Sequence, residues 1–152
     1  MNNIVIIGAG QAAAWAAHTL RQQGFTGRLS IVSNEERVFY ERPPLSKQVL
    51  AGDMAAEALQ IFNDEAIAAM NIDWHKPATA ERIDRISHQV VLSDGTVLPY
   101  DKLLIATGSR ARLPVPHWGD IKGVYTMRNV DDCHQLRDQF GQIEELVLIG
   151  GG

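Results

Sequence analysis

Two glycines and a small residue near the N-terminus have the spacing that binds the phosphates of a dinucleotide in other proteins. Gly8, Gly10 and Ala13 fit the pattern G-x-G-x-x-A, with Gln11 and Ala12 inside it. The first glycine permits a tight turn, the second lets backbone amides approach a pyrophosphate, and the small third residue allows close helix–strand packing. The unpaired N–H groups and the dipole of the following helix favour an anion. The pattern alone is a weak indication, so its weight depends on the flanking elements.

Those flanking elements are predicted on both sides of the loop. Residues 4–7 form a β-branched run typical of a strand buried on both faces. Residues 11–23 are rich in alanine and end at Gly24, which predicts a helix with a C-terminal glycine. Residues 29–32 predict a second strand. Strand, glycine turn, helix and strand in this order indicate a βαβ unit with a parallel sheet.

An acidic residue that binds the ribose hydroxyls is expected at the end of the second strand. Asn34 and Glu35 lie there, and Glu35 supplies the carboxylate. The alternative is a tight βα turn that binds no ligand. The strand, the helix and the acidic residue together favour the nucleotide site.

Further along the chain the pattern predicts a β-meander. Residues 79–86 and 88–93 are expected to be paired strands, with a turn at 94–95 and a return strand at 96–98. The turn is Asp-Gly, which is favoured in hairpins. Residues 103–107 are an apolar run expected to form another buried strand.

Three further helices are expected, at residues 46–51, 63–70 and 130–140. The predicted N-caps are Asn63 for the second helix and Asn129 or Asp131 for the third. Residues 146–149 are apolar and precede glycines at 150–152, so they repeat the strand-then-glycine pattern of the N-terminus. We expect them to be a buried strand.

A second motif is more specific than the glycine loop. Residues 39–47 read Phe-Tyr-Glu-Arg-Pro-Pro-Leu-Ser-Lys. This run resembles the signature of FAD-dependent ferredoxin reductases, the reductase components of bacterial aromatic-ring dioxygenase and cytochrome P450 systems. Residues 11–14 and 20–27 are most similar to the reductases of phenylpropionate/cinnamate dioxygenase systems. The similarity runs from Ile4 to Gly152.

The resemblance implies a fold and a division of the chain. The fold class is α/β, a Rossmann-like FAD-binding domain with a parallel sheet, crossover helices and a β-meander, truncated and followed by the first strand of a second nucleotide-binding domain. Residues 1–110 correspond to the N-terminal part of the FAD-binding domain, 111–128 to a linker or crossover, and 129–152 to the start of the NAD-binding domain. Family members are longer, so we expect this chain to be a fragment, a truncated gene product, or half of a protein assembled in trans.

The resemblance also implies contacts with the flavin. Lys47 lies near the reactive edge of the isoalloxazine and Arg42 along the cofactor. A nearby cation lowers the cost of the negative charge that builds at flavin N1. A solvated lysine is the alternative for Lys47, although lysine in a first helical turn opposes the helix dipole.

Other positions are assigned by resemblance alone. The backbone at Ala80 meets the adenine, and the strand end before Gly108 forms the second flavin motif. Arg112 and Arg128 are assigned to the flavin, and the alternative is that they are ordinary surface arginines. Relatives often carry Asp-Glu where this chain has Asn-Glu before its 39–47 motif. The residues assigned in this way are Ala80, Ala106, Thr107, Gly108, Arg112 and Arg128.

By resemblance, the intact protein moves a hydride from NADH to FAD and passes electrons singly to a Rieske-type [2Fe–2S] ferredoxin. No catalytic side chain is expected, because the flavin converts between two-electron and one-electron partners. One alternative is a non-catalytic nucleotide-binding fragment. Another is a related reductase with a different acceptor, such as rubredoxin or oxygen. Without the second nucleotide domain, this chain alone is not expected to oxidise NADH.

Composition excludes several other classes. The 152 residues carry 14 Lys+Arg against 18 Asp+Glu, a net charge of −4, which argues against a nucleic-acid binder. A lone cysteine, Cys133, gives neither a disulfide nor metal-ligand spacing and indicates a reducing, cytoplasmic location. No membrane span is expected. An unpaired sheet edge would favour association with another copy of the chain.

Overall fold

The computed structural model describes residues 2–150, so the glycines at 151 and 152 of the second predicted glycine motif lie outside the described residues. The chain forms two compact units. Unit 1 consists of Met1–Glu41 and Gln60–Ser109, and unit 2 of Arg42–Leu59 and Arg110–Gly152.

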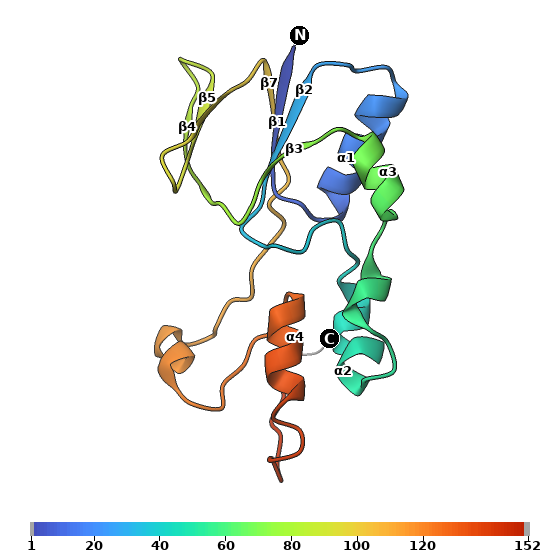
Figure 1. Ribbon diagram of the computed structural model, residues 1–152. Helices are drawn as coiled ribbons and strands as arrows, with labels where there is room; N and C mark the ends of the chain where they lie inside the picture. The colour runs from blue at the N-terminus through green and yellow to red at the C-terminus, as the bar shows by residue number, and fades with distance from the viewer. Residues whose placement is uncertain (1, 151–152) are drawn as a thin grey trace. The chain divides into compact units, whose positions relative to one another are not determined.

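Unit 1 contains a four-stranded parallel sheet in the order β3-β2-β1-β7 (Figure 1). β1 is paired with β2 on one side and with β7 on the other, both in parallel. The parallel βαβ unit predicted from the sequence is therefore confirmed. The strands are β1 (Asn3–Ile7), β2 (Arg28–Val32), β3 (Asp73–His75) and β7 (Lys102–Ile105).

Helices α1 (Gln11–Gln22) and α3 (Asp64–Ala69) lie on one side of this sheet (Figure 1). Successive side chains of a strand point to opposite faces, so Ile4 and Ile6 pack in the core on the helix side, together with buried alanines of α1. Asn63 caps α3, since its side chain accepts a hydrogen bond from Ala66 N at 2.8 Å. This cap was predicted from the sequence and is confirmed.

The other face of the sheet is covered by an antiparallel meander, which Figure 1 shows on the side opposite α1. Its strands are β4 (Ala80–Asp84), β5 (Gln89–Leu92) and β6 (Val97–Pro99). Val5 and Ile7 pack against its buried side chains. Because both faces are covered, β1 needs apolar side chains at consecutive positions. The meander and its Asp-Gly turn are confirmed.

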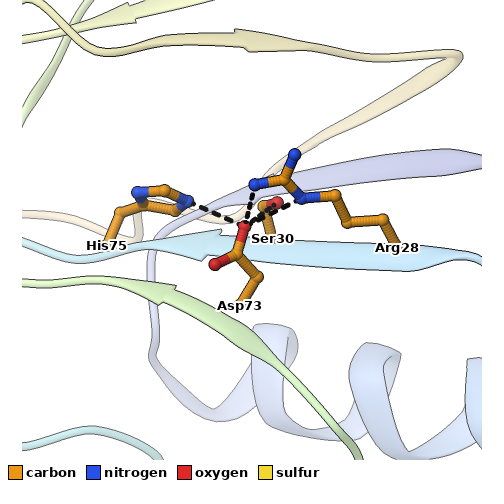
Figure 2. A network of polar contacts seen from close by, with 4 residues as sticks. All are labelled: Arg28, Ser30, Asp73 and His75. Carbon is orange, nitrogen blue, oxygen red and sulfur yellow. Dashed lines mark hydrogen bonds and ion pairs between the residues drawn. The ribbon is translucent and has the colours of Figure 1, made fainter.

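The β3 edge of the sheet carries a polar network, shown in Figure 2. One carboxylate oxygen of Asp73 accepts hydrogen bonds from Arg28 Nε at 2.9 Å, Arg28 Nη2 at 2.6 Å and Ser30 Oγ at 3.0 Å. His75 Nε2 lies 3.1 Å from the same oxygen. Partial burial by itself raises the pKa of Asp73, but the hydrogen bonds from Arg28, Ser30 and His75 outweigh it and lower that pKa below its ordinary value.

Unit 2 contains helices α2 (Gln48–Ala51) and α4 (Val130–Arg137), and 3₁₀ turns at Pro43–Ser46, Ala56–Leu59 and Pro116–Asp120. Asn129 caps α4 in a capping box, in which its side chain accepts from Asp132 N at 2.8 Å and Asp132 accepts from Asn129 N at 3.1 Å. Cys133 Sγ donates to Leu45 O at 3.2 Å and connects α4 to the turn before α2. No helix within residues 2–150 is long and apolar enough to cross a membrane.

Two strand predictions are wrong in part. Residues 146–149 form no regular secondary structure and are 54–82% exposed, because no strand of the described chain pairs with them. The strand predicted at 103–107 forms as β7 and ends at Ile105, but it is an edge strand with one side unpaired. Its Leu104 and Ile105 are therefore 38% and 61% exposed instead of buried.

Candidate functional site

Backbone packing around Gly8 is tight enough to exclude any side chain. Gly8 has a φ of +106°, and a Cβ built there would lie 2.2 Å from Ala106 O. Gly8 N donates to Val32 O at 2.8 Å, and Ala106 N donates to Ile7 O at 2.8 Å. The carboxyl ends of β1, β2 and β7 therefore meet at the glycine loop. β1 has β2 on one side and β7 on the other, so the chain continues to opposite sides of β1. Open α/β sheets bind ligands at such a topological switch point.

The start of α1 is open on its outer side. Gly10 is the N-cap of α1, and a Cβ built there would have no heavy atom within 4 Å. Gln11 and Ala12 are exposed, whereas Ala13 is fully buried in the core beneath the loop. The first turn contains no acidic residue. Its backbone N–H groups are therefore positioned to bind an anion, and the small residue at 13 lets the helix pack closely.

Glu35 lies in the segment that follows β2. The hydroxyl of the buried Ser33 donates to Glu35 O at 3.0 Å and accepts from Glu35 N at 3.1 Å. The Tyr40 hydroxyl donates to the Glu35 carboxylate. Phe39 N donates to Ala9 O at 2.9 Å, which ties this segment to the glycine loop. Glu35 is half-buried, and the neighbouring Asn34 is exposed.

The other predicted residues of unit 1 lie after the end of β7 and at the start of β4. Ala106 follows β7 and packs partly into the core beside the loop. Thr107 and Gly108 come next and are exposed. Ala80 begins β4 and is half-buried. Ala78 N donates to Ser33 O at 2.7 Å, so the approach to β4 is attached to the Glu35 segment.

In unit 2 the structure brings together two of the four predicted cations. Arg42 Nη1 donates to Arg128 O at 2.8 Å, and Arg128 N donates to Asp132 Oδ2 at 2.7 Å. Lys47 is exposed and forms the N-cap of α2, one residue before the helix begins. Arg112 is exposed in the segment before the 3₁₀ turn at Pro116–Asp120.

One of these cations lacks a hydrogen-bond acceptor. Arg128 Nε is buried and has no partner among residues 2–150. Buried polar groups of proteins are nearly always paired, and an acceptor on a ligand would satisfy this one. Within unit 2, a buried N–H donor of this kind fits a ligand rich in oxygen acceptors, as a dinucleotide is. The described residues hold no cluster of three metal-ligating side chains.

Sequence reasoning missed the residues that hold Glu35. Tyr40 belongs to the 39–47 motif, but its hydroxyl partner could not be identified from spacing. Ser33 precedes Asn34 directly and lies just outside the strand predicted at residues 29–32. A polar side chain beside a predicted ribose-binding acid was the available signal.

Comparisons with known proteins agree with this geometry. The family model described as pyridine nucleotide-disulphide oxidoreductase matches residues 2–152. The biphenyl dioxygenase system ferredoxin–NAD(+) reductase component of Paraburkholderia xenovorans is 37% identical over 152 residues, which cover 100% of this chain and 37% of the relative. The 3-phenylpropionate/cinnamic acid dioxygenase ferredoxin–NAD(+) reductase component of Photorhabdus laumondii is 38% identical over 149 residues, with coverage of 97% and 37%.

A solved structure gives the same result. The crystal structure of the covalent putidaredoxin reductase–putidaredoxin complex matches with a TM-score of 0.83 and 38% identity, over 91% of this chain and 34% of that chain. The chain therefore spans about a third of the length of the relatives it matches. The Rossmann-like fold and the resemblance seen in the 39–47 motif are confirmed.

Proposed function

Since this chain belongs to the pyridine nucleotide-disulphide oxidoreductase family, we propose that it is the FAD-binding portion of an NADH:ferredoxin oxidoreductase of an aromatic-ring dioxygenase system. The observation that carries the proposal is the backbone closure at Gly8 beside the open N-terminus of α1. This combination leaves room for a pyrophosphate on one side of the loop and for no side chain on the other.

Each part of the site has a proposed role in holding the cofactor. The amides at the start of α1 bind the pyrophosphate, and Glu35 accepts hydrogen bonds from the adenosine ribose. The backbone at Ala80 contacts the adenine, and residues 106–108 approach the flavin. The cations proposed to contact the flavin are Arg42, Lys47, Arg112 and Arg128.

In this proposal the protein's own residues bind FAD and set the charge around it. FAD, when bound, supplies the conversion between a two-electron donor and one-electron acceptors. Arg42 Nη1 donates to the backbone carbonyl of Arg128 in unit 2, and we propose that each of the two cations favours anionic groups on the ligand. An acceptor oriented toward Arg128 Nε would pair the buried donor that the described residues leave unpaired.

The relatives that this chain matches are about three times as long as its 152 residues. We propose that residues 1–110 are the N-terminal part of the FAD-binding domain, 111–128 a linker, and 129–152 the beginning of an NADH-binding domain. In that arrangement the apolar residues 146–149 become a strand once neighbouring strands pair with them. The proposed electron acceptor is the [2Fe–2S] ferredoxin of the dioxygenase system, and the proposed location is the cytoplasm.

A second acceptor class is supported by one structural match. The NADH:rubredoxin oxidoreductase of Clostridium acetobutylicum matches with a TM-score of 0.76 at 25% identity, over 90% of this chain and 35% of that chain. Rubredoxin is therefore the alternative acceptor. Steady-state reduction of each carrier by the longer protein would separate the two, since the favoured acceptor should show the higher kcat/KM.

Flavin binding by the chain is tested with Gly10→Val. A Cβ at this position meets no heavy atom within 4 Å beyond its chain neighbours, and the valine side chain fills the space proposed for the pyrophosphate. We expect FAD affinity, measured by quenching of flavin fluorescence, to fall at least about tenfold, with an unchanged melting temperature. Gly141→Val is the matched control, because its Cβ also meets nothing within 4 Å. Unchanged FAD affinity in Gly10→Val, or tighter binding of NAD(P) or ATP than of FAD, would contradict the proposal.

A further inference from the structure

Glu35 is held by side chains that the proposed flavin site does not yet include. The Tyr40 hydroxyl donates to its carboxylate, and the Ser33 hydroxyl bonds to both its backbone N–H and its carbonyl. Tyr40 and Ser33 are 3% and 5% exposed. Resting on the proposed function, we propose that Tyr40 is a positioning residue that presents the Glu35 carboxylate to the ribose diol of a bound adenine nucleotide.

The backbone around Tyr40 is fixed independently of Glu35. Phe39 is fully buried with a φ of +54°, its N–H donates to Ala9 O at 2.9 Å, and its carbonyl accepts from Ile61 N at 2.8 Å. Tyr40 itself forms an antiparallel bridge with Gln60. The phenol is therefore placed by unit 1 before any ligand arrives. A buried tyrosine hydroxyl needs a partner, and Glu35 is the acceptor within reach.

This contact matters because glutamate is a flexible ligand. A half-buried glutamate loses rotamer freedom when it binds, and that loss weakens affinity. A hydrogen bond from a rigid phenol orders the side chain during folding instead, so the carboxylate meets the diol already in place. Tyr40 is thus expected to change selectivity for the diol and not only overall affinity.

The Ser33 contact supports the same orientation from the backbone side. Ser33 N donates to His75 O at 3.0 Å, and Ser33 O accepts from Ala78 N at 2.7 Å. The backbone of Ser33 is therefore hydrogen-bonded to His75, the last residue of β3, and to Ala78, three residues further along. Its hydroxyl then fixes the turn from which the Glu35 side chain projects.

The test compares two ligands across matched variants of the full 152-residue chain. FAD and its 2′-deoxyadenosine analogue differ only in the 2′-hydroxyl, one of the two hydroxyls of the diol proposed to meet Glu35. We expect the wild type to favour FAD about tenfold, and Tyr40→Phe to reduce FAD affinity about three- to tenfold while changing affinity for the analogue less than about twofold. Glu35→Gln should lose the same discrimination, and adding Tyr40→Phe to it should have no further effect. Tyr100→Phe removes a phenol hydroxyl elsewhere in unit 1 and should leave both affinities unchanged.

The ratio of the two affinities separates positioning from a merely structural role. Equal loss of both ligands in Tyr40→Phe, or no loss of either, would overturn the inference while leaving flavin binding intact. Tyr40→Phe effects that persist in the Glu35→Gln background would also overturn it. Failure of the wild type to bind FAD, or indifference to Gly10→Val, would instead overturn the proposed function itself.

Discussion

The two edges of the parallel sheet in unit 1 differ in the polarity of their side chains. At the β3 edge, Asp73 gathers hydrogen bonds from Arg28 and Ser30, and His75 lies beside the same oxygen (Figure 2). At the β7 edge, Leu104 and Ile105 are exposed and no described strand follows. Charged side chains discourage a further strand from pairing, whereas an apolar unpaired edge invites one.

The surface beside β7 strengthens this contrast. A largely apolar hollow of about 340 Å³ lies between β7, β1 and α1, lined in part by Ile4, Ala16, Leu20 and Leu103. The β3 edge is therefore protected against pairing with a further strand, whereas the β7 edge has the apolar surface of a contact site. We propose that β7 is the edge through which this chain associates with a further strand, from a second copy when the chain is studied alone.

The largest expected effect on stability comes from Arg21, which hydrogen-bonds the segment that leads into β3. The guanidinium of Arg21 donates to Met70 O and Phe25 O at 2.6 Å, Gly27 O at 2.9 Å and Asn71 O at 3.1 Å. Arg21→Ala leaves these carbonyls without that donor, so we expect a loss of about 2–3 kcal/mol in the free energy of unfolding, measured in urea. Arg85→Ala, at an exposed arginine of the meander, is the control and should cost less than about 0.5 kcal/mol. Equal losses would show that Arg21 does not stabilise this segment.

A charge on the β7 edge should weaken its pairing with a second copy of the chain. Ile105→Lys places a cation on β7, and we expect the dissociation constant of self-association, measured by sedimentation, to rise about tenfold, or about 1.4 kcal/mol. Ile86→Lys makes the same exchange at a side chain that is 97% exposed in the meander. This control should leave association unchanged. A wild-type chain that stays monomeric at high concentration, or equal effects of the two variants, would contradict pairing through β7.

Removing the charge of Asp73 at the β3 edge should lower the free energy of unfolding by a smaller amount. Asp73→Asn removes the charge that Arg28 and His75 face, and both side chains of the Arg28–Asp73 ion pair are substantially exposed. Solvent screening therefore limits the expected loss to about 1 kcal/mol in the free energy of unfolding. Asp53→Asn, at an exposed aspartate of unit 2, serves as the control. If the two variants unfold alike, the network contributes nothing to stability.

The smallest effect is a pH dependence at the same residue. The pKa of Asp73 is lowered in the folded protein, because hydrogen bonds from Arg28, Ser30 and His75 outweigh the partial burial that opposes them. A lowered folded pKa means that the stabilisation is fully present above the unfolded value of about 3.9 and is lost as the pH falls through the folded pKa. The difference in unfolding free energy between the wild type and Asp73→Asn should therefore be greatest above about pH 5 and shrink below about pH 4. A difference that grows on acidification would reverse this sign.

What the sequence predicted well was local. The βαβ order, the cap at Asn63 and the Asp-Gly hairpin each depend on residues a few positions apart, and Asn129, one of the two candidates for the next cap beside Asp131, is the residue that caps α4. Burial of residues 103–107 and 146–149 was predicted wrongly because burial of a strand depends on its neighbours, and periodicity reports only that the side chains are apolar.

Longer-range contacts at the site were out of reach for a related reason. The hydrogen bond from Phe39 to Ala9 joins the Glu35 segment to the glycine loop across 30 residues, and the Arg21 contacts with Met70 and Asn71 span 49 and 50 residues. Such pairs follow from how the elements pack. The sequence could name Glu35 and the loop, but not the phenol of Tyr40 that holds the acid.

The single thiol of the chain has a practical consequence. Cys133 is fully buried, and desolvation raises its pKa despite the opposing charge of Arg137. The thiolate is the species that reacts with alkylating reagents, so the folded chain should be almost inert to them. Alkylation must then wait for α4 to separate from the turn at Leu45, and its rate reports that opening. The chain thus carries its own reporter of local unfolding in unit 2, readable by mass spectrometry without an added label.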